Sequence, residues 1–225
     1  MAEIYLITGA SRGIGLELAR KVAARGDSVV GTVRRAEDAA APRDAGIRVE
    51  LLDVGSDDSA RALARRLDGM SIDVLVNNAG RQYRVNAIEE LDFAEMADTH
   101  NVNALGPARV MQALLPNLEA EGGARVIHMT SRMGCFGEYE QHGMHGYRSS
   151  KAALNMLHRN IADELKPRGI TCVALHPGWV RTDMGGPEAT LTVEESVASM
   201  LSVIDGVTPD DAGAIFDHTG APLPW

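Results

Sequence analysis

The sequence EIYLITGASRGIGLELARKVAARG, residues 3–26, joins an apolar run of strand type to a glycine-rich turn and an amphipathic helix pattern. Glycines let the backbone turn tightly and approach a phosphate closely, and the start of the following helix offers free N–H groups and a partial positive charge. On its own, a glycine-rich turn can be no more than a tight turn. Its position between a first strand and a helix favours a phosphate-binding turn at residues 8–15.

Short apolar runs alternate with helix-like segments along the rest of the chain. The runs lie at residues 28–33, 47–54, 72–80, 124–131, 170–178 and 213–219. Strands that are apolar throughout need cover on both faces, which is typical of a parallel sheet with helices on either side. The pattern predicts a doubly wound α/β fold, a Rossmann fold of about seven strands, as a single domain over residues 1–225.

Several of these runs end in polar or glycine residues, in the segments TGAS, DV, NNAG, TSRMG and HPGWV. In open α/β sheets, ligands bind beyond the carboxyl ends of the strands. We therefore expect the five segments to line one cleft.

The composition limits the classes of partner. The chain has 22 basic and 31 acidic residues, a formal charge of -9, which disfavours nucleic acid and anionic membranes. Cys135 and Cys172 lack CxxC spacing, which argues against a disulfide framework and against a metal site. No secretory signal pattern and no run near the roughly 18 apolar residues of a membrane span is present. These features predict a cytoplasmic protein.

Seven motifs follow one another along the chain. They are TGASRGIG at 8–15, Asp53–Val54, NNAG at 77–80, Asn103 in NVNALG, Ser131 in MTSRMG, YRSSK at 147–151 and PGWVRT at 177–182. Together they resemble the short-chain dehydrogenase/reductase family over nearly the whole chain. HPGWVRTDMGG, LTVEESV and the final PW resemble the branch with bacterial C-factor proteins and sniffer-type carbonyl reductases. The resemblance implies a small carbonyl reductase, or a member with a role in developmental signalling.

Tyr147 and Lys151 stand four residues apart at a predicted helix start. A carbonyl that accepts a hydride needs a proton donor, and a free phenol is too weak an acid at neutral pH because its pKa is near ~10. Residues at this spacing share a helix face, and a neighbouring ammonium favours phenolate. The alternative is an exposed pair on a surface helix, but the other motifs favour Tyr147 as the acid/base. The resemblance also implies that Lys151 binds the ribose hydroxyls of the nicotinamide half of the cofactor.

Ser131 and Thr130 compete for the role of orienting the substrate carbonyl, because successive strand residues point to opposite faces. The resemblance favours Ser131. It also assigns Asn103 to a water that links Lys151 to solvent. Taken alone, Asn103 would be a helix-interior amide that bends its backbone.

The end of the second predicted strand indicates the cofactor. It reads Gly31 to Arg35, with no acid before Glu37. A carboxylate there would hold the ribose 2′-hydroxyl of NADH, whereas a guanidinium can bind the 2′-phosphate of NADPH through two hydrogen bonds. We therefore expect NADPH/NADP+, with Arg34 and Arg12 as its clamp, and NADH less. The alternative is that Arg34 and Arg35 merely belong to a surface loop.

The resemblance implies the other cofactor contacts. Asp53 and Val54 would flank the adenine, the NNAG segment would line its ribose, and PGWVRT would cradle the nicotinamide. The expected cofactor residues are Gly9, Ser11, Arg12, Gly13, Ile14, Gly15, Arg34, Asp53, Val54, Asn77, Ala79, Gly80, Tyr147, Lys151, Pro177, Gly178, Val180 and Thr182. Asn77 and Asn78 could instead stabilise the end of their strand.

The substrate is indicated only broadly. About ten residues separate Thr182 from the next predicted helix, so the lid should be short and the cleft permissive. The candidate apolar wall residues are Met133, Cys135, Phe136, Met144 and Trp179. We expect small apolar aldehydes, ketones or quinones. Ser131 and Tyr147 are 16 residues apart, more than the family usually shows, and a loop can absorb the difference.

Two further expectations follow from the resemblance. The helices around residues 103–120 and 150–166 are ones that the family often uses for association, which predicts a homodimer or homotetramer. A second functional hypothesis is a signalling protein of C-factor type that binds NADP(H) without obligatory turnover.

Overall fold

The computed structural model describes residues 2–119, 123–139 and 142–225. Its centre is a seven-stranded sheet in the order β3-β2-β1-β4-β5-β6-β7, with every neighbouring pair parallel. The strands are β1 Ile4–Ile7, β2 Ser28–Val33, β3 Arg48–Leu51, β4 Val74–Asn77, β5 Ala124–Met129, β6 Ile170–His176 and β7 Ile215–Asp217. The strand order reverses between β1 and β4, where doubly wound sheets bind their ligands.

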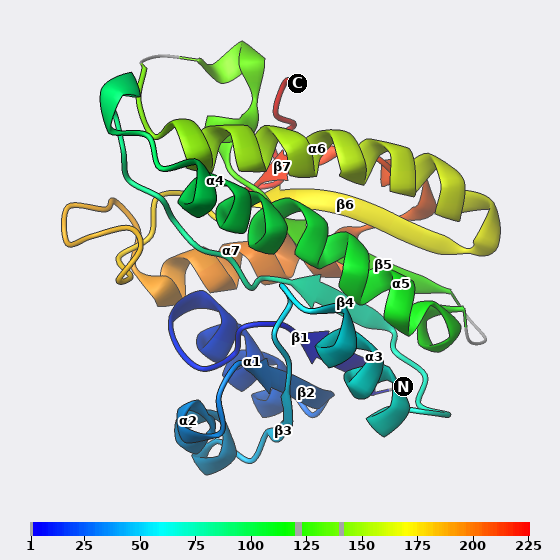
Figure 1. Cartoon of the computed structure of the whole chain (residues 1–225). Coiled ribbons are helices and arrows are strands. Elements are labelled where there is room, and N and C mark those ends of the chain that lie inside the picture. The colour runs from blue at the N-terminus through cyan, green and yellow to red at the C-terminus, as the bar shows by residue number, and fades with distance from the viewer. Residues whose placement is uncertain (1, 120–122, 140–141) are drawn as a thin grey trace.

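Helices cover both faces of the sheet (Figure 1). The α-helices are α1 Gly13–Ala24, α2 Ala40–Asp44, α3 Asp57–Arg66, α4 Phe93–His100, α5 Gly106–Leu118, α6 His145–Leu165 and α7 Val193–Gly206. Short 3-10 helices lie at Ala36–Ala39, Ile88–Glu90, Arg132–Gly134, Phe136–Glu138, Lys166–Arg168 and Pro209–Asp211. The predicted doubly wound α/β fold with about seven strands is confirmed.

Two cores result from strand alternation. Leu6 of β1 packs into the core under α3, α5 and α6, while its neighbours Tyr5 and Ile7 pack into the core under α1 and α7. All three side chains are fully buried. Burying a side chain of this size contributes about 1.5–3 kcal/mol, so apolar cover on both faces stabilises the central strands.

Side-chain caps are present at the starts of three α-helices. Ser56 caps α3 by accepting from the Ser59 N–H, Asp92 caps α4, and Thr192 caps α7 in a capping box with Glu195. The predicted helix start near Thr192 is therefore confirmed. The first turn of α1 has no side-chain cap, as is also true of α2, α5 and α6, so N–H groups at its start have no capping side chain.

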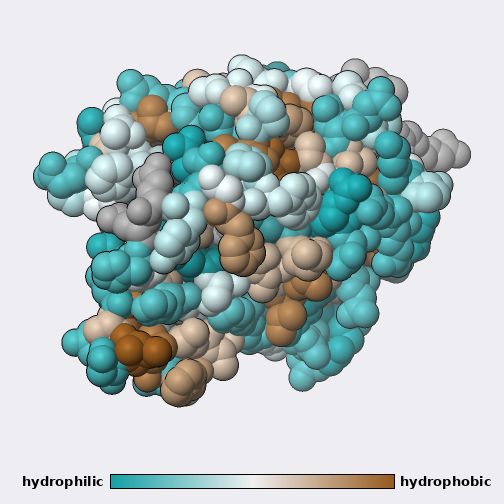
Figure 2. Space-filling model, turned by 90° about the horizontal axis from the view of Figure 1, so that it is seen from above, coloured by the Kyte–Doolittle hydropathy of each residue, from teal (hydrophilic) through white to brown (hydrophobic). Residues whose placement is uncertain are grey.

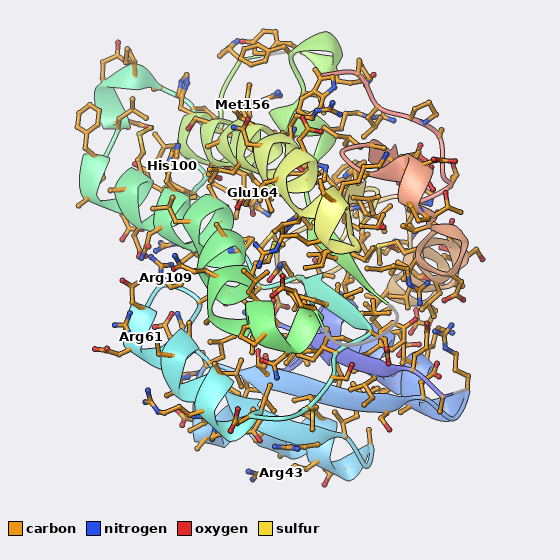
Figure 3. The ribbon with its side chains drawn as sticks, turned by 90° about the vertical axis from the view of Figure 1, so that its right-hand side faces the viewer. Arg43, Arg61, His100, Arg109, Met156 and Glu164 are labelled. Carbon is orange, nitrogen blue, oxygen red and sulfur yellow. The ribbon has the colours of Figure 1, made fainter. Side chains whose placement is uncertain are left out.

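A π-helix, Asn101–Leu105, joins α4 to α5 and contains the buried Asn103. Arg109 on α5 fixes this region, because it donates to the carbonyl oxygen of Val54 at 2.6 Å and to Oδ1 of Asn101 at 3.0 Å. Figure 3 shows Arg109 on α5 facing α3, which carries Arg61. These contacts tie α5 to the segment that follows β3.

The surface seen from above, over α6, is mainly hydrophilic with small separate apolar groups (Figure 2). Within the described residues, no helix is both long and apolar enough to span a bilayer, and no group of three His, Cys, Asp or Glu side chains could hold a metal ion.

Candidate active site

The glycine turn lies at the end of β1 and leads into α1. A Cβ atom at position 15 would lie 2.4 Å from the carbonyl oxygen of Gly9, so the backbone packs too closely there for any residue but glycine. The Asn78 side chain donates from Nδ2 to the carbonyl oxygens of Thr8 at 2.8 Å and Gly9 at 3.2 Å. Asn78 thus holds the turn, which is the structural role among its predicted alternatives.

The start of α1 fits an anionic group. Arg12 is the N-cap residue and makes no capping hydrogen bond, and the first turn carries no acid. Gly13 has a φ of +55°, in the left-handed region, which turns the backbone into the helix. Ser11 is half-buried beside it, and Ile14 packs against the core under α1 and α7. Free N–H groups at a helix start bind phosphate, so these residues fit the diphosphate of a dinucleotide.

Arg12 and Arg34 lie close enough to act on the same carboxylate. Asp38 has a lowered pKa, first because Arg35 hydrogen-bonds to it, and also because the charges of Arg35, Arg34 and Arg12 favour its ionised form. Arg35 bonds to Asp38 with Nε–Oδ2 at 3.0 Å, whereas Arg34 is exposed and has no ion pair within the described part of the chain. The structure therefore brings the two predicted clamp residues into one region.

Asp53 and Val54 follow β3 at the same edge of the sheet. Asp53 is exposed and accepts a hydrogen bond from the Gly55 N–H at 2.9 Å. Val54 is buried and packs on Gly106, where a Cβ atom would lie 3.1 Å from Cγ2 of Val54. Asp53 can thus present polar atoms to a base, while the side chain of Val54 belongs mainly to the core.

The NNAG segment follows β4. Some of its residues bond to the protein interior, and Gly80 lies beside the predicted catalytic residues. Asn77 is buried, and its Nδ2 lies 3.3 Å from Nδ1 of His128 on β5, which gives its side chain a partner inside the protein. The Ala79 N–H donates to Oγ1 of Thr8 at 3.0 Å. A Cβ atom at position 80 would lie 3.3 Å from Oδ1 of Asn103, so Gly80 leaves room beside the predicted catalytic residues.

Tyr147 and Lys151 lie in the first two turns of α6. Lys151 is only 6% exposed, and its Nζ donates to the carbonyl oxygen of Met129 at 2.7 Å. The same Nζ lies 5.9 Å from the centre of the Tyr147 ring. Burial lowers the pKa of Lys151 to about 8, because a charged ammonium loses hydration there. The predicted i, i+4 pair is therefore brought together away from bulk water.

The expected effect of Lys151 on its neighbour is corrected by this geometry. Burial raises the pKa of Tyr147 above its ordinary value, and a hydrogen bond with Ser131 opposes that rise. Within the protein itself, desolvation of the phenolate thus outweighs the opposing effect of Ser131 on this pKa. Sequence spacing showed which residues share a helix face, but it could not show how deeply the face is buried.

Ser131 and Thr130 point to different partners, as expected for successive residues. The Thr130 hydroxyl donates to Oδ1 of the buried Asn155 on α6. Ser131 lies close enough to Tyr147 to lower the pKa of the phenol, and its Oγ accepts from the Met133 N–H at 3.2 Å. Ser131 is therefore the one of the two that lies with Tyr147.

Asn103 is fully buried within the π-helix, an arrangement often found at functional sites. Its Oδ1 accepts from the Arg81 N–H at 2.8 Å, and its Nδ2 donates to the Arg81 carbonyl oxygen at 2.8 Å and to Oγ of Ser150 at 2.9 Å. Asn103 thus clamps the segment after β4 against α6, next to Lys151. Asn103 therefore lies in an irregular helical segment and close to Lys151, and its role in a water relay stays a prediction.

The PGWVRT segment follows β6 and leads into the lid. Gly178 has a φ of +83°, and a Cβ atom there would lie 2.5 Å from Cδ1 of Leu191. The carbonyl oxygen of Pro177 accepts from the Ser196 hydroxyl at 2.7 Å, and the buried Val180 forms a parallel bridge with Leu191.

Thr182 brings the lid to the glycine turn. A Cβ atom at position 13 would lie 3.4 Å from Cγ2 of Thr182. The strand ends after β1 and β6 therefore meet at the switch point of the sheet.

The segment between Ser131 and Tyr147 contains two short 3-10 helices. Cys135 is buried, whereas Phe136 is 83% exposed and Trp179, in the lid, is 52% exposed. Only part of the predicted apolar wall is thus available to a substrate. Residues 140–141 of this segment lie outside the described residues.

Three residues with roles near the site were not predicted. Asp183 forms an ion pair with Arg12, with Oδ2–Nη1 at 2.9 Å. Asn155 holds Thr130, and Gly134 lets its loop pack on α6, where a Cβ atom would lie 2.7 Å from the carbonyl carbon of Lys151. For Asp183, the sequence offered one signal: an acid directly after the predicted cofactor residue Thr182, with a charge opposite to that of Arg12. The sequence offered no signal for the other two.

Comparison with known proteins places this arrangement in a family. The family model described as short chain dehydrogenase matches residues 3–190. The chain belongs to the short-chain dehydrogenase family of oxidoreductases, which act on small molecules, and the predicted family is confirmed.

The relatives agree with the predicted branch. The C-signal protein of Myxococcus xanthus is 48% identical over 165 residues, which is 73% of this chain and 99% of that protein. The NADPH-bound carbonyl reductase from chicken fatty liver has a TM-score of 0.91 and 32% identity, covering 100% of this chain and 99% of the other. The carbonyl reductase Sniffer of D. melanogaster has a TM-score of 0.93 and 31% identity, covering 100% of both chains.

Proposed function

We propose that this protein is an NADPH-dependent carbonyl reductase in which Tyr147 is the general acid/base. The observation that carries the proposal is the group at the start of α6, where Tyr147 lies with Ser131 and with the buried Lys151. A purely structural role for Tyr147 would not explain why the Lys151 ammonium is buried beside it with no carboxylate partner among the described residues. The similarity to two carbonyl reductases along the full chain supports the reaction class.

The residues divide the reaction between them. A bound nicotinamide supplies or accepts the hydride. Ser131 and Tyr147 hydrogen-bond to the carbonyl oxygen of the substrate, and Tyr147 donates its phenolic proton as negative charge develops on that oxygen. The Lys151 ammonium stabilises the phenolate that remains, because an opposite charge nearby favours the ionised form. Lys151 can then pass a proton to the phenolate, and Asn103 is proposed to hold a water that links Lys151 to solvent and replaces that proton, as the resemblance implies.

The cofactor preference is proposed on charge. Arg12 and Arg34 both act on Asp38, and Arg34 makes no ion pair among the described residues, which supports a 2′-phosphate site beside the uncapped start of α1. The proposed cofactor contacts otherwise remain those expected from the sequence, with Asn77 contributing backbone rather than side-chain atoms because of His128.

Replacing the clamp residue tests this preference. Arg34→Ala should weaken NADPH binding by about 10-fold, since a hydrogen bond to a charged group is worth about 1.5–3 kcal/mol. NADH binding should stay unchanged, because NADH has no 2′-phosphate. Arg35→Ala is the matched control, since Arg35 already pairs with Asp38. A wild-type preference for NADH would contradict the proposal.

The proposed substrates are small apolar aldehydes, ketones or quinones. The experiment is to follow NADPH oxidation with a panel of such carbonyls. Turnover with at least one class is expected, and its absence despite tight cofactor binding would overturn the reductase proposal.

A second candidate function is signalling that needs cofactor binding but no turnover. The 48% identity with the C-signal protein is the observation that favours it. Binding without turnover in the carbonyl panel would support this candidate.

A cytoplasmic location and a homodimer or homotetramer stay predictions. For the latter, Leu105 and Met156 are 49% and 60% exposed on the outer face of the π-helix and α6, where Figure 3 shows Met156.

A further inference from the structure

The first turn of the lid, residues 182–186, is bonded to two segments outside the lid. Nη1 of Arg12 in the glycine turn lies 2.9 Å from Oδ2 of Asp183. Arg84, between β4 and α4, donates to the carbonyl oxygen of Met184. Two consecutive lid residues are thus bonded to the segments that follow β1 and β4.

The lid turn is bonded internally and to Trp179. The Gly185 N–H donates to Oγ1 of Thr182 at 3.0 Å, and the Gly186 N–H donates to the Thr182 carbonyl oxygen at 2.8 Å. The indole N–H of Trp179 donates to the Gly185 carbonyl oxygen at 2.9 Å. A change in the Asp183 contact is therefore transmitted to Trp179, which is 52% exposed and can report it.

The Arg12 guanidinium serves two anions in this arrangement. It is bonded to Asp183, and it is also the group proposed to bind the 2′-phosphate with Arg34. Both partners of the ion pair are largely exposed, at 78% and 74%, and such a pair contributes only about 0.2–1 kcal/mol. A phosphate monoester carries a charge of about -1.5 to -2 at neutral pH and can bind the guanidinium bidentately. The phosphate is therefore the stronger competitor.

We propose that Asp183 is a positioning residue that competes with the cofactor 2′-phosphate for Arg12, so that cofactor binding releases the lid turn from the glycine turn. The proposal rests on the proposed NADPH specificity. It makes Asp183 a determinant of the discrimination between NADPH and NADH, although Asp183 itself touches neither cofactor. Release of the turn leaves Arg84 as its remaining tie.

The binding test uses nucleotides that lack the nicotinamide. Adenosine 2′,5′-bisphosphate carries the 2′-phosphate, and 5′-AMP does not. Asp183→Asn should bind the bisphosphate about two- to fivefold more tightly than wild type, which corresponds to loss of the competing ion pair, and should bind 5′-AMP unchanged. Glu188→Gln is the matched control, because it removes the same charge from an exposed lid residue that has no ion pair within the described ranges.

A second readout follows the lid. The chain has two tryptophans, so Trp225→Phe leaves Trp179 as the only one. In that background, the bisphosphate should shift the Trp179 emission. Adding Asp183→Asn should give the shifted emission already in the free protein, with little further change on binding. A residue with a merely structural role would not move this signal.

The outcomes separate the two proposals. If wild type prefers the bisphosphate over 5′-AMP but Asp183→Asn tightens both equally, tightens neither or weakens the bisphosphate, the role of Asp183 is overturned and the NADPH proposal stands. If wild type does not distinguish the two nucleotides, both proposals are overturned. An unchanged Trp179 signal on bisphosphate binding would contradict release of the lid turn.

Discussion

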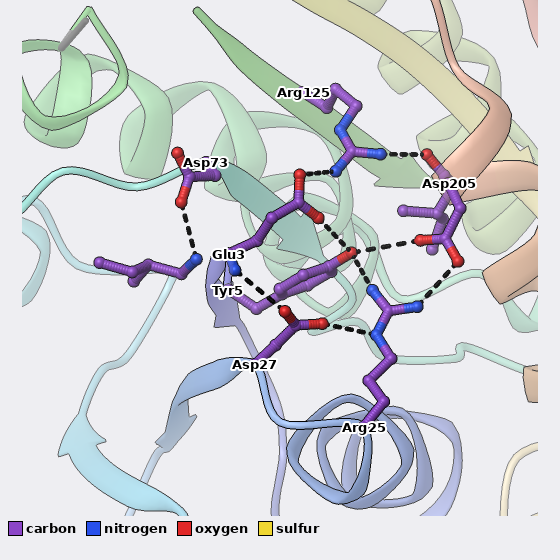
Figure 4. Close-up of polar contacts among 9 residues, drawn as sticks. Glu3, Tyr5, Arg25, Asp27, Asp73, Arg125 and Asp205 are labelled. Carbon is purple, nitrogen blue, oxygen red and sulfur yellow. Dashed lines mark hydrogen bonds and ion pairs between the residues drawn. The ribbon is translucent and has the colours of Figure 1, made fainter. Parts of the chain in front are cut away.

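At the amino ends of the strands, charged groups neutralise one another, whereas at the carboxyl ends the buried Lys151 forms no ion pair with a carboxylate of the described residues. Figure 4 shows the amino-end cluster, in which Arg25 and Arg125 lie among the three carboxylates of Glu3, Asp27 and Asp205. Tyr5 belongs to the same cluster, and Asp73, drawn beside it, accepts from the Ile4 N–H. At the other end, Lys151 is bonded to a backbone carbonyl oxygen. The same fold thus uses charge for cohesion at one end and keeps it available for chemistry at the other.

Two tyrosines, one at each end of the sheet, differ in the partners of their hydroxyl groups. Tyr5 and Tyr147 both have a raised pKa, in each case first because of burial. The Tyr5 hydroxyl accepts from Arg25 and donates to Oε2 of Glu3 at 3.2 Å, so its hydrogen bonds are taken by permanent partners. At Tyr147, the neighbouring hydroxyl that affects the pKa is that of Ser131, a partner that can turn toward a substrate oxygen. Availability of the hydroxyl, rather than its pKa alone, distinguishes the proposed acid.

The largest expected effect is loss of the carboxyl-end cation. Lys151→Met keeps the length of the side chain and removes its charge, so the phenolate left by proton donation loses its stabilisation. We expect kcat to fall by about 100-fold or more, in the range that general acid catalysis contributes. Steady-state rates with NADPH and an accepted carbonyl measure it. A fall of less than threefold would show that the charge of Lys151 is not used.

The matching change at the amino end should affect stability instead. Arg25→Met leaves Asp27 and Asp205 without their common partner and removes a donor to Tyr5. We expect the free energy of unfolding to fall by about 1–3 kcal/mol, as for partly buried polar groups that lose their partner, with kcat unchanged. Denaturant unfolding and steady-state kinetics on the same sample check both. A large fall in kcat without a loss of stability would contradict the view that the charges at the amino end serve stability and not activity.

Much of this fold and site was predictable, because the determining signals are local. Apolar runs identified the strands, and TGASRGIG and YRSSK marked where α1 and α6 begin. The pKa of Tyr147 was predicted in the wrong direction for the protein itself, since burial depends on the whole fold. The contact between Arg12 and Asp183 spans 171 positions, from 12 to 183, and spacing cannot predict it.

A third prediction concerns the buried histidines behind the site. His128 and His158 are fully buried with ring centres 5.5 Å apart, and burial lowers the pKa of His158 to about 4 and that of His128 well below its ordinary value. Burial also lowers the pKa of His176 to about 4. Unfolded histidines titrate near ~6.5, so the unfolded state binds more protons as the pH falls below that value.

Stability should therefore be complete above pH ~6.5 and decrease toward pH ~4, with each histidine contributing up to about 1.4 kcal/mol per pH unit. Denaturant unfolding between pH 7 and pH 5 measures this slope, in a range where most carboxylates stay ionised. His158→Phe should reduce the change of unfolding free energy with pH by about the contribution of one histidine. Equal stability at pH 7 and pH 5 would contradict buried, neutral histidines.

The most direct test of the central claim compares Tyr147→Phe with Tyr5→Phe, because each removes one tyrosine hydroxyl and the two tyrosines lie at opposite ends of the sheet. The measurement is kcat/KM for an accepted carbonyl, with NADPH affinity determined on the same samples. We predict a loss of about 100-fold or more for Tyr147→Phe with cofactor affinity retained, and unchanged kcat/KM for Tyr5→Phe. Near-full activity of Tyr147→Phe would contradict its role as the general acid.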